Sequence, residues 1–181
     1  MLINQLYKKC ETLATEQLER YRITQPPIPI DKIAREIGLN IVDFQFENDI
    51  AGALVIEKDI GTIGINPSNS PQRRRFTIAH ELGHYLMHRV GNEFFVDKDF
   101  LVKWRNSASS SYSEIEKYQE IEANAFAAAI LMPKNFIVAE MEKPEMKSLA
   151  EAQLINKLAS RFKVSMIAMS YRLTNINNNY I

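Results

Sequence analysis

Apolar and polar positions alternate along this 181-residue chain with two periods, which together predict helices and short strands. Helical periodicity first marks residues 2–20, and the proline-rich stretch 25–29 then ends any helix. Short stretches rich in Ile, Val and Phe predict strands at 39–46, 51–57 and 62–66. Their short connections favour an antiparallel sheet of about three strands, with a mixed sheet as the alternative.

The second half of the chain is predicted to be mainly helical. Ser70 followed by Pro71 is typical of a helix start, and the pattern predicts a helix from there to about His88. Residues 91–112 lack clear periodicity and are predicted to form a loop. Further helices are predicted at 114–131, 134–142, 148–162 and 165–174.

The composition is that of a globular protein, with 46% hydrophobic and 24% charged residues. Lys+Arg and Asp+Glu both count 22, so no global field favours nucleic acid or an anionic membrane. A single cysteine, Cys10, excludes an internal disulfide. The first twenty residues carry many charges and no long apolar core, so neither a signal peptide nor a membrane span is predicted. We therefore expect a cytoplasmic protein that has no membrane partner.

All three histidines fall between positions 80 and 88. In the segment His80-Glu81-Leu82-Gly83-His84, a spacing of four places both histidines on one helical face, one turn apart. Two imidazoles can then reach one ion, and paired imidazoles with a carboxylate suit Zn²⁺, with Mn²⁺ or Fe²⁺ as alternatives. Glu81 is the predicted catalytic residue, because in this motif it takes a proton from the zinc-bound water and later passes it to the leaving nitrogen.

A catalytic zinc needs a third protein ligand, and the helix predicted at 114–131 offers one. Glu122 lies in the middle of that helix's apolar arc, whereas Glu116 and Glu120 point elsewhere on the helical wheel. A lone buried carboxylate is costly, and a bound cation removes the cost, so Glu122 is the predicted third ligand. His88 is a rival ligand, although three histidines along one straight helix would struggle to converge on a tetrahedral ion. The apolar arc contains Ile115, Tyr118, Ile121, Ala125, Phe126 and Ala129.

These residues resemble the ImmA/IrrE-type family of zinc metallopeptidases. Two blocks carry the resemblance: Arg75–His88, RFTIAHELGHYLMH, and Glu122–Pro133, EANAFAAAILMP. A weaker third block runs from Ile28 to Leu39.

The resemblance implies an α+β, zincin-like fold in which the sheet packs with an active-site helix and a second ligand-bearing helix. It implies zinc ligands at His80, His84 and Glu122, with Glu81 as the catalytic acid/base. It also implies a cytoplasmic endopeptidase with a protein substrate. In several family members that substrate is a helix-turn-helix repressor encoded nearby, within a stress, mobile-element or toxin–antitoxin-like switch.

The predicted organisation is an N-terminal helix at 1–24, a zincin-like catalytic core at 25–147, a C-terminal helix pair at 148–174 and a frayed tail at 175–181. The helix pair resembles a helix-turn-helix but is expected to belong to the same domain.

The helix pair also supports an alternative function, a DNA-binding or partner-binding regulator whose zinc is structural or vestigial. Its DNA contacts would come from Arg161, Lys163 and Arg172, but zero net charge and a thin basic patch favour a packing role. In a peptidase, a tyrosine could also stabilise the oxyanion, and the candidates are Tyr85, Tyr112 and Tyr118.

Overall fold

The computed structural model describes residues 2–46, 50–58, 60–89, 94–98 and 114–178. The chain forms two compact units, one of residues 30–124 and one that combines residues 1–29 with 125–181. The boundary falls inside helix α5 (Glu114–Leu131), whose first half therefore belongs to the unit that contains the sheet. The domain boundaries expected from the sequence stay a prediction.

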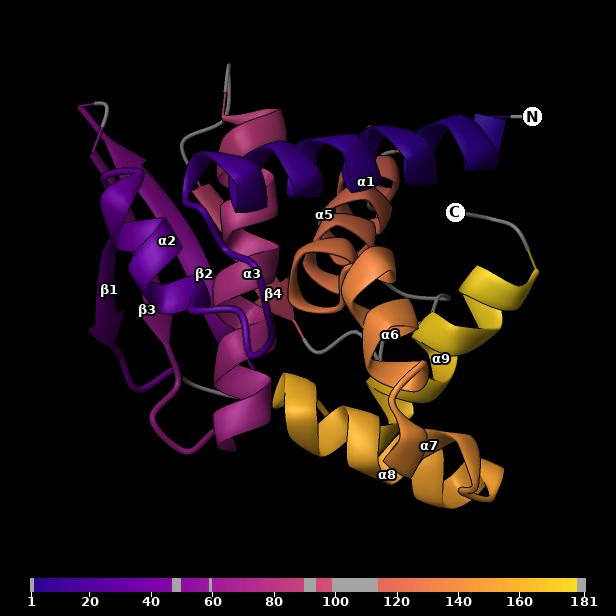
Figure 1. The fold of residues 1–181 in the computed structure, drawn as a ribbon. Helices are drawn as coiled ribbons and strands as arrows, with labels where there is room; N and C mark the ends of the chain where they lie inside the picture. The colour runs from indigo at the N-terminus through magenta and orange to yellow at the C-terminus, as the bar shows by residue number, and fades with distance from the viewer. Residues whose placement is uncertain (1, 47–49, 59, 90–93, 99–113, 179–181) are drawn as a thin grey trace. The chain divides into compact units, whose positions relative to one another are not determined.

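The first unit is built on a four-stranded sheet in the order β1-β3-β2-β4 (Figure 1). All three predicted strands are present, and because β1 pairs with β3 in parallel while β2 is antiparallel to β3 and β4, the sheet is mixed. The prediction of a loop at 91–112 is wrong for β4. That strand is only five residues long and two of them are charged, so it has no hydrophobic repeat, and its conformation comes from pairing with β2. The strands are β1 (Asn40–Asp43), β2 (Ile50–Glu57), β3 (Ile60–Ile65) and β4 (Phe94–Lys98).

Helices α2 (Ile30–Glu36) and α3 (Pro71–His88) pack together beside this sheet (Figure 1). The start of α3 is as predicted, because the Ser70 hydroxyl accepts a hydrogen bond from the Arg73 amide at 3.2 Å. Gly52 of β2 lets α3 come close, since a Cβ there would lie 2.3 Å from Cγ2 of Thr77. The close contact at Gly52 therefore sets the distance between α3 and the sheet, and with it the position of the histidines that α3 carries.

The outer edge of β1 is occupied by side chains of its own unit. The Phe44 amide donates to a β3 carbonyl, so by alternation the backbone groups of Ile41 and Asp43 face away from β3. Arg35 Nη2 donates to the Ile41 carbonyl at 3.3 Å. Arg74 Nη2 pairs with Asp43 Oδ1 at 2.7 Å.

The second unit is helical. Its helices are α1 (Leu2–Arg20), the second half of α5, α6 (Lys134–Met141), α7 (Pro144–Lys147), α8 (Glu151–Phe162) and α9 (Met166–Asn177). All of them except the short α7 were predicted. Arg172 ties three of its segments together: Nε donates to the Met132 carbonyl at 2.8 Å, and Nη2 donates to Glu11 of α1 at 3.0 Å. This arginine is only 3% exposed, so it is a core residue of the helical unit.

Glu140 of α6 is a second buried charge in the helical unit. Burial alone would raise the pKa of its carboxyl, but hydrogen bonds from Lys143 at 2.7 Å and Arg161 at 3.3 Å outweigh burial. The net result is a Glu140 pKa below its usual value. The carboxylate therefore links α6 to α8 in its charged form.

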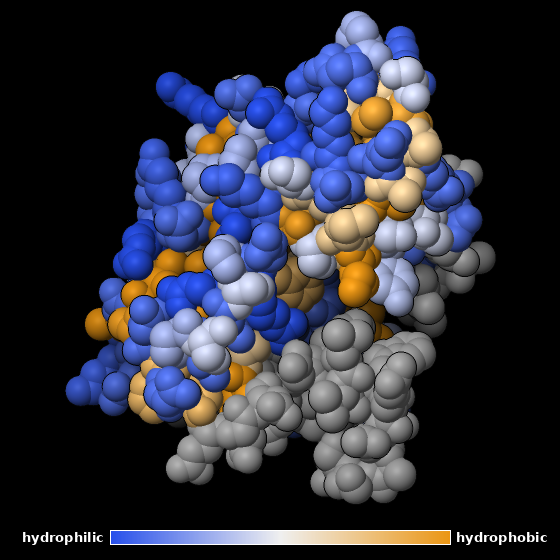
Figure 2. Space-filling view, turned by 90° about the horizontal axis from the view of Figure 1, so that it is seen from below, coloured by the Kyte–Doolittle hydropathy of each residue, from blue (hydrophilic) through white to orange (hydrophobic). Residues whose placement is uncertain are grey.

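Hydrophilic residues predominate on the face of the molecule that Figure 2 shows, with apolar side chains scattered among them. Among the described residues, one stretch, Glu114–Met141, has the length and mean hydropathy, 1.2, that could cross a membrane. Of its apolar window, 56% is buried inside the protein, as in the core helix of many folds.

Candidate metal centre

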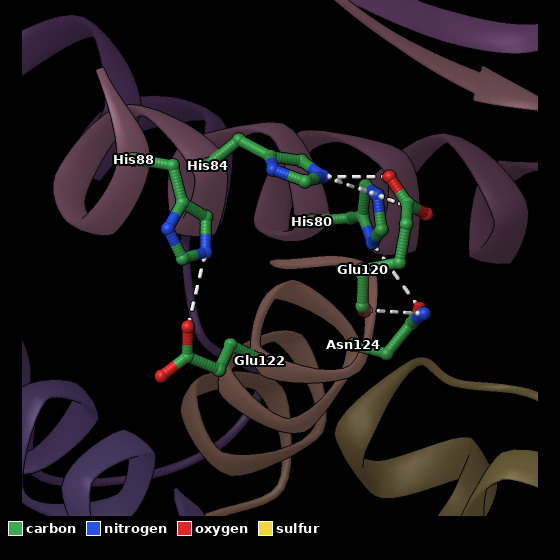
Figure 3. A network of polar contacts seen from close by, with 6 residues as sticks. All are labelled: His80, His84, His88, Glu120, Glu122 and Asn124. Carbon is green, nitrogen blue, oxygen red and sulfur yellow. Dashed lines mark hydrogen bonds and ion pairs between the residues drawn. The ribbon is translucent and has the colours of Figure 1, made fainter. Parts of the chain in front are cut away.

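Two histidines of α3 converge on one point. His80 and His84 are one turn apart, each 1% exposed, and their Nε2 atoms lie 3.1 Å from each other (Figure 3). The two histidines therefore lie on one face of α3, as their spacing of four predicts, and each ring directs its Nε2 atom to the same place.

A carboxylate from α5 completes the cluster. Oε1 of Glu120 lies 3.2 Å from Nε2 of His84, and Oε2 lies 3.7 Å from Nε2 of His80 (Figure 3). One nitrogen from each histidine and one carboxylate oxygen all lie within 4.8 Å of one another. Two buried imidazoles and one partly buried carboxylate therefore face a common centre.

The spacing of these atoms fits a divalent metal ion. Ligands about 2.0–2.1 Å from a tetrahedral zinc are about 3.3 Å from one another. The two Nε2 atoms lie 3.1 Å apart, and the nearest Glu120 oxygens lie 3.2 Å (Oε1) from His84 and 3.7 Å (Oε2) from His80, close to that value. Two nitrogens and one carboxylate oxygen are also the donor set of catalytic zinc sites that keep a position open for water or substrate.

Glu122, the predicted third ligand, lies elsewhere. Its Oε2 is 3.5 Å from Nε2 of His88, the rival ligand, and the structure brings neither residue into the cluster (Figure 3). Glu122 as a metal ligand stays a prediction. The helical wheel places Glu120 off the apolar arc, and the structure turns its carboxylate toward the two histidines. The first half of α5 exposes its apolar side chains and turns Glu120 and Asn124 toward α3, so polar contacts rather than hydrophobicity decide its inward face. The exposed side chains are Ile115 (70%), Tyr118 (53%) and Ile121 (45%).

Asn124 is a residue of the site that reasoning from the sequence missed. Its Oδ1 lies 3.1 Å from Nδ1 of His80 (Figure 3). The signal that could have found it is its spacing of four from Glu120, which puts both side chains on one face of α5.

Glu81, the predicted catalytic residue, follows His80 on α3 and is 0% exposed. Of the three tyrosines considered for the oxyanion, Tyr85 is buried beside Gly61 of β3, and Tyr118 is exposed on α5. Tyr112 lies outside the described residues.

The side chains proposed for DNA contact have other partners in the helical unit. Arg172 is buried and donates hydrogen bonds to Glu11 and to the Met132 carbonyl, so it cannot reach a nucleic acid in this conformation. Arg161 donates to the buried Glu140, and Lys163 ends α8 in the left-handed conformation with φ of 55°. Of the two roles considered for Arg172, DNA contact and packing, the structure shows packing, because its guanidinium joins α9 to Glu11 and to the Met132 carbonyl.

Taken with the fold, the cluster defines a class of protein. A helix that carries two buried histidines one turn apart, packed beside a small mixed sheet and joined by a carboxylate from a second helix, is a zincin-like arrangement. Proteins of this class are metallopeptidases that use a divalent cation.

Comparison with known proteins gives the family. Residues 34–174 match the peptidase family described as the IrrE N-terminal-like domain, and the chain belongs to this ImmA/IrrE family of metallopeptidases. It is 36% identical over 112 residues to the radiation response metalloprotease IrrE of Deinococcus radiodurans, a match that covers 61% of this chain and 30% of that protein. It is 27% identical over 128 residues to immunity region protein 2 of Bacillus phage phi105, which covers 71% of this chain and 70% of the phage protein.

Among solved structures, a Mycobacterium tuberculosis transcriptional regulator has a similar fold, with a TM-score of 0.57 and 20% sequence identity. The match covers 94% of this chain and 47% of that one. The chain thus spans about a third of the length of IrrE and about half of the mycobacterial chain, and the resemblance to the latter concerns the fold alone.

Proposed function

We propose that this chain is a zinc-dependent endopeptidase whose metal is held by His80, His84 and Glu120. The observation that carries the proposal is the convergence of two imidazole nitrogens and one carboxylate at separations of 3.1–3.7 Å. A zinc ion bound there would supply Lewis-acid polarisation of the scissile carbonyl. Mn²⁺ or Fe²⁺ could use the same donors, and Glu122 is the competing candidate for the third ligand.

Glu81 is the proposed general base and acid. It adjoins His80 on α3 and is fully buried, so its carboxylate is kept from bulk solvent. In peptide hydrolysis it would take a proton from the attacking water and give it to the nitrogen of the leaving amine. A positioned base of this kind contributes about 10²–10⁴-fold to the rate.

The proposed substrate is a helix-turn-helix transcriptional repressor encoded near the gene for this chain, and the proposed location is the cytoplasm. Two similarities support a regulatory role: one relative is a radiation response metalloprotease, and the other is an immunity region protein of a phage. A peptidase that cuts a repressor would convert a signal into transcription without binding DNA itself. The buried position of Arg172 and the ion pair of the exposed Arg161 with Glu140 agree with a chain that does not bind DNA itself.

The test is a cleavage assay with the purified chain, loaded with zinc, and the repressor encoded beside its gene. Metal content is measured by mass spectrometry of the purified protein, and products are weighed by intact mass. Glu81→Gln should retain zinc and lose cleavage, since the amide cannot accept the proton. Glu116→Gln removes an exposed carboxylate from α5 and is the matched control that should cut as wild type does.

Cleavage by Glu81→Gln at the wild-type rate would refute the proposed mechanism. Zinc bound at one equivalent without cleavage of that repressor would refute the proposed substrate and leave the metal site intact. Failure of the wild-type chain to bind any divalent metal would refute the enzyme proposal itself.

A further inference from the structure

Asn124 lies between two residues of the metal cluster. Its Oδ1 is 3.1 Å from Nδ1 of His80, and its Nδ2 donates to the backbone carbonyl of Glu120 at 2.8 Å (Figure 3). One side chain thus contacts one histidine ligand through its ring and the residue that supplies the carboxylate through its backbone. Asn is a poor residue for the interior of a helix, so its presence in the middle of α5 calls for a reason beyond helix formation.

The two contacts determine which nitrogen of His80 carries a proton. A backbone carbonyl can only accept, so the amide group that faces Glu120 must be the NH₂ and not the oxygen. Oδ1 is then the atom that faces His80, and because an amide oxygen only accepts, Nδ1 of the ring must carry the hydrogen. In a neutral imidazole this leaves Nε2 with its lone pair, and Nε2 is the atom that faces His84 and Glu120.

We propose that Asn124 is a positioning residue of the metal centre: it selects the Nδ1–H tautomer of His80 and holds the ring so that the Nε2 lone pair faces the metal position. The proposal rests on the metal site of the proposed function. Histidine ligands in metal sites commonly donate the other ring N–H to an oxygen acceptor, and loss of such an acceptor costs about 10–100-fold in metal affinity. The Nδ2 contact supports the same arrangement from the other side, since it keeps the acceptor oxygen turned toward the ring.

Two substitutions of Asn124 distinguish the role of its acceptor oxygen from that of its amide donor. Asn124→Leu keeps the approximate volume and removes both polar groups. Asn124→Asp keeps an oxygen acceptor for Nδ1–H and removes the donor to Glu120. Asn156→Leu, at an exposed position of α8, is the control for loss of an amide from a helix.

Zinc affinity is measured for all four proteins by competition with a chromophoric chelator. We expect Asn124→Leu to bind zinc about 10–100-fold more weakly than wild type, and Asn124→Asp and Asn156→Leu to stay within about threefold. The second readout is the tautomer of His80 in the metal-free protein, from ¹H–¹⁵N correlation spectra of the imidazoles. The chain has three histidines, so the spectrum holds three sets of signals. His80 should be protonated at Nδ1 in wild type and in Asn124→Asp, and should lose that preference in Asn124→Leu.

Zinc binding by Asn124→Leu as tight as by wild type would overturn the proposal, as would an Nε2–H tautomer of His80 in the metal-free wild type. Equal weakening by Leu and Asp would also overturn it, because a merely structural role of Asn124 would not be rescued by an acceptor. If the wild type bound no metal, the proposed function would fail, and the tautomer measurement would still decide whether Asn124 sets the state of His80.

Discussion

The third ligand can be tested with two isosteric substitutions on the same helix. Glu120 offers its carboxylate to both histidines, at 3.2 and 3.7 Å, whereas Glu122 lies 3.5 Å from His88, outside the cluster. Glu120→Gln and Glu122→Gln each remove one charge from α5 and keep the shape of the side chain. If the geometry identifies the ligand, only the first substitution should impair metal binding.

The size of the effect follows from the share of one ligand in the binding energy. Four-ligand zinc sites have apparent affinities of about 10–16 kcal/mol, or about 2.5–4 kcal/mol for each ligand. An amide oxygen is a weaker donor than a carboxylate, so Glu120→Gln should weaken zinc binding by at least about 100-fold. At a metal concentration above both dissociation constants this removes about 2.7 kcal/mol of metal-induced stabilisation, which for a chain of this size lowers the metal-dependent rise in Tm by about 5–10 °C.

Chelator competition gives the affinity, and thermal unfolding with and without zinc gives the shift in Tm. We expect Glu122→Gln to keep wild-type affinity to within about threefold, because the pair that it disturbs lies one turn away from the cluster. Weak binding by Glu122→Gln together with wild-type binding by Glu120→Gln would refute the reasoning from distances and return the ligand to Glu122.

Three further predictions concern stability. Gly52→Ala should destabilise the fold by about 1–3 kcal/mol in urea titration, because the new Cβ would lie 2.3 Å from Cγ2 of Thr77 and force α3 away from the sheet. A variant as stable as the wild type would show that α3 can shift freely. Arg172→Met should cost about 2–4 kcal/mol, at the lower end of the range for broken buried pairs since Glu11 is partly exposed; an unchanged denaturation midpoint would contradict a core role. Glu140 has a folded-state pKa below its unfolded value, so its stabilisation is present above the unfolded pKa, about 4.3, and is lost as pH falls through the folded pKa. Glu140→Gln should therefore be less stable than wild type at pH 7, with a difference that shrinks toward pH 3, and a difference that grew on acidification would contradict the sign of the shift.

The parts of the site that could be predicted are those set by local spacing. Four residues make one helical turn in any helix, so the convergence of His80 and His84 needed only the correct prediction of α3. That prediction was secure because Ser70 and Pro71 mark the helix start by backbone chemistry that does not depend on the rest of the fold.

The carboxylate that lies nearest to the two histidines could not be predicted from hydrophobicity. The apolar arc of α5 predicts the buried face correctly only in the second half of the helix, where Phe126 and Ile130 are fully buried. In the first half the inward face meets the histidines of α3, so the inward residues are Glu120 and Asn124, and Ile121 faces solvent. A buried polar cluster reverses the usual rule for which face of a helix is inside, and only knowledge of the neighbour reveals it.

The sheet was predictable in its hairpin and not in its longer-range pairing. β2 and β3 are joined by a short turn and are antiparallel, as expected. β1 pairs in parallel with β3, which is not its neighbour in sequence, and no local pattern predicts that pairing. β4 pairs with β2 but is short and charged, so no hydrophobic pattern predicts it either.

Two arginines that contact β1, Arg35 of α2 and Arg74 of α3, affect how this protein behaves at high concentration. A free sheet edge is a template on which another chain can add a strand, and such edges are common origins of aggregation. Here the outward carbonyl of Ile41 already accepts a hydrogen bond from Arg35, so an incoming strand would have to displace that cation, and the Arg74–Asp43 ion pair places a second charge pair beside the edge. Within the described residues, charged side chains hinder strand addition at this edge, and salt should weaken that protection because it screens their contacts.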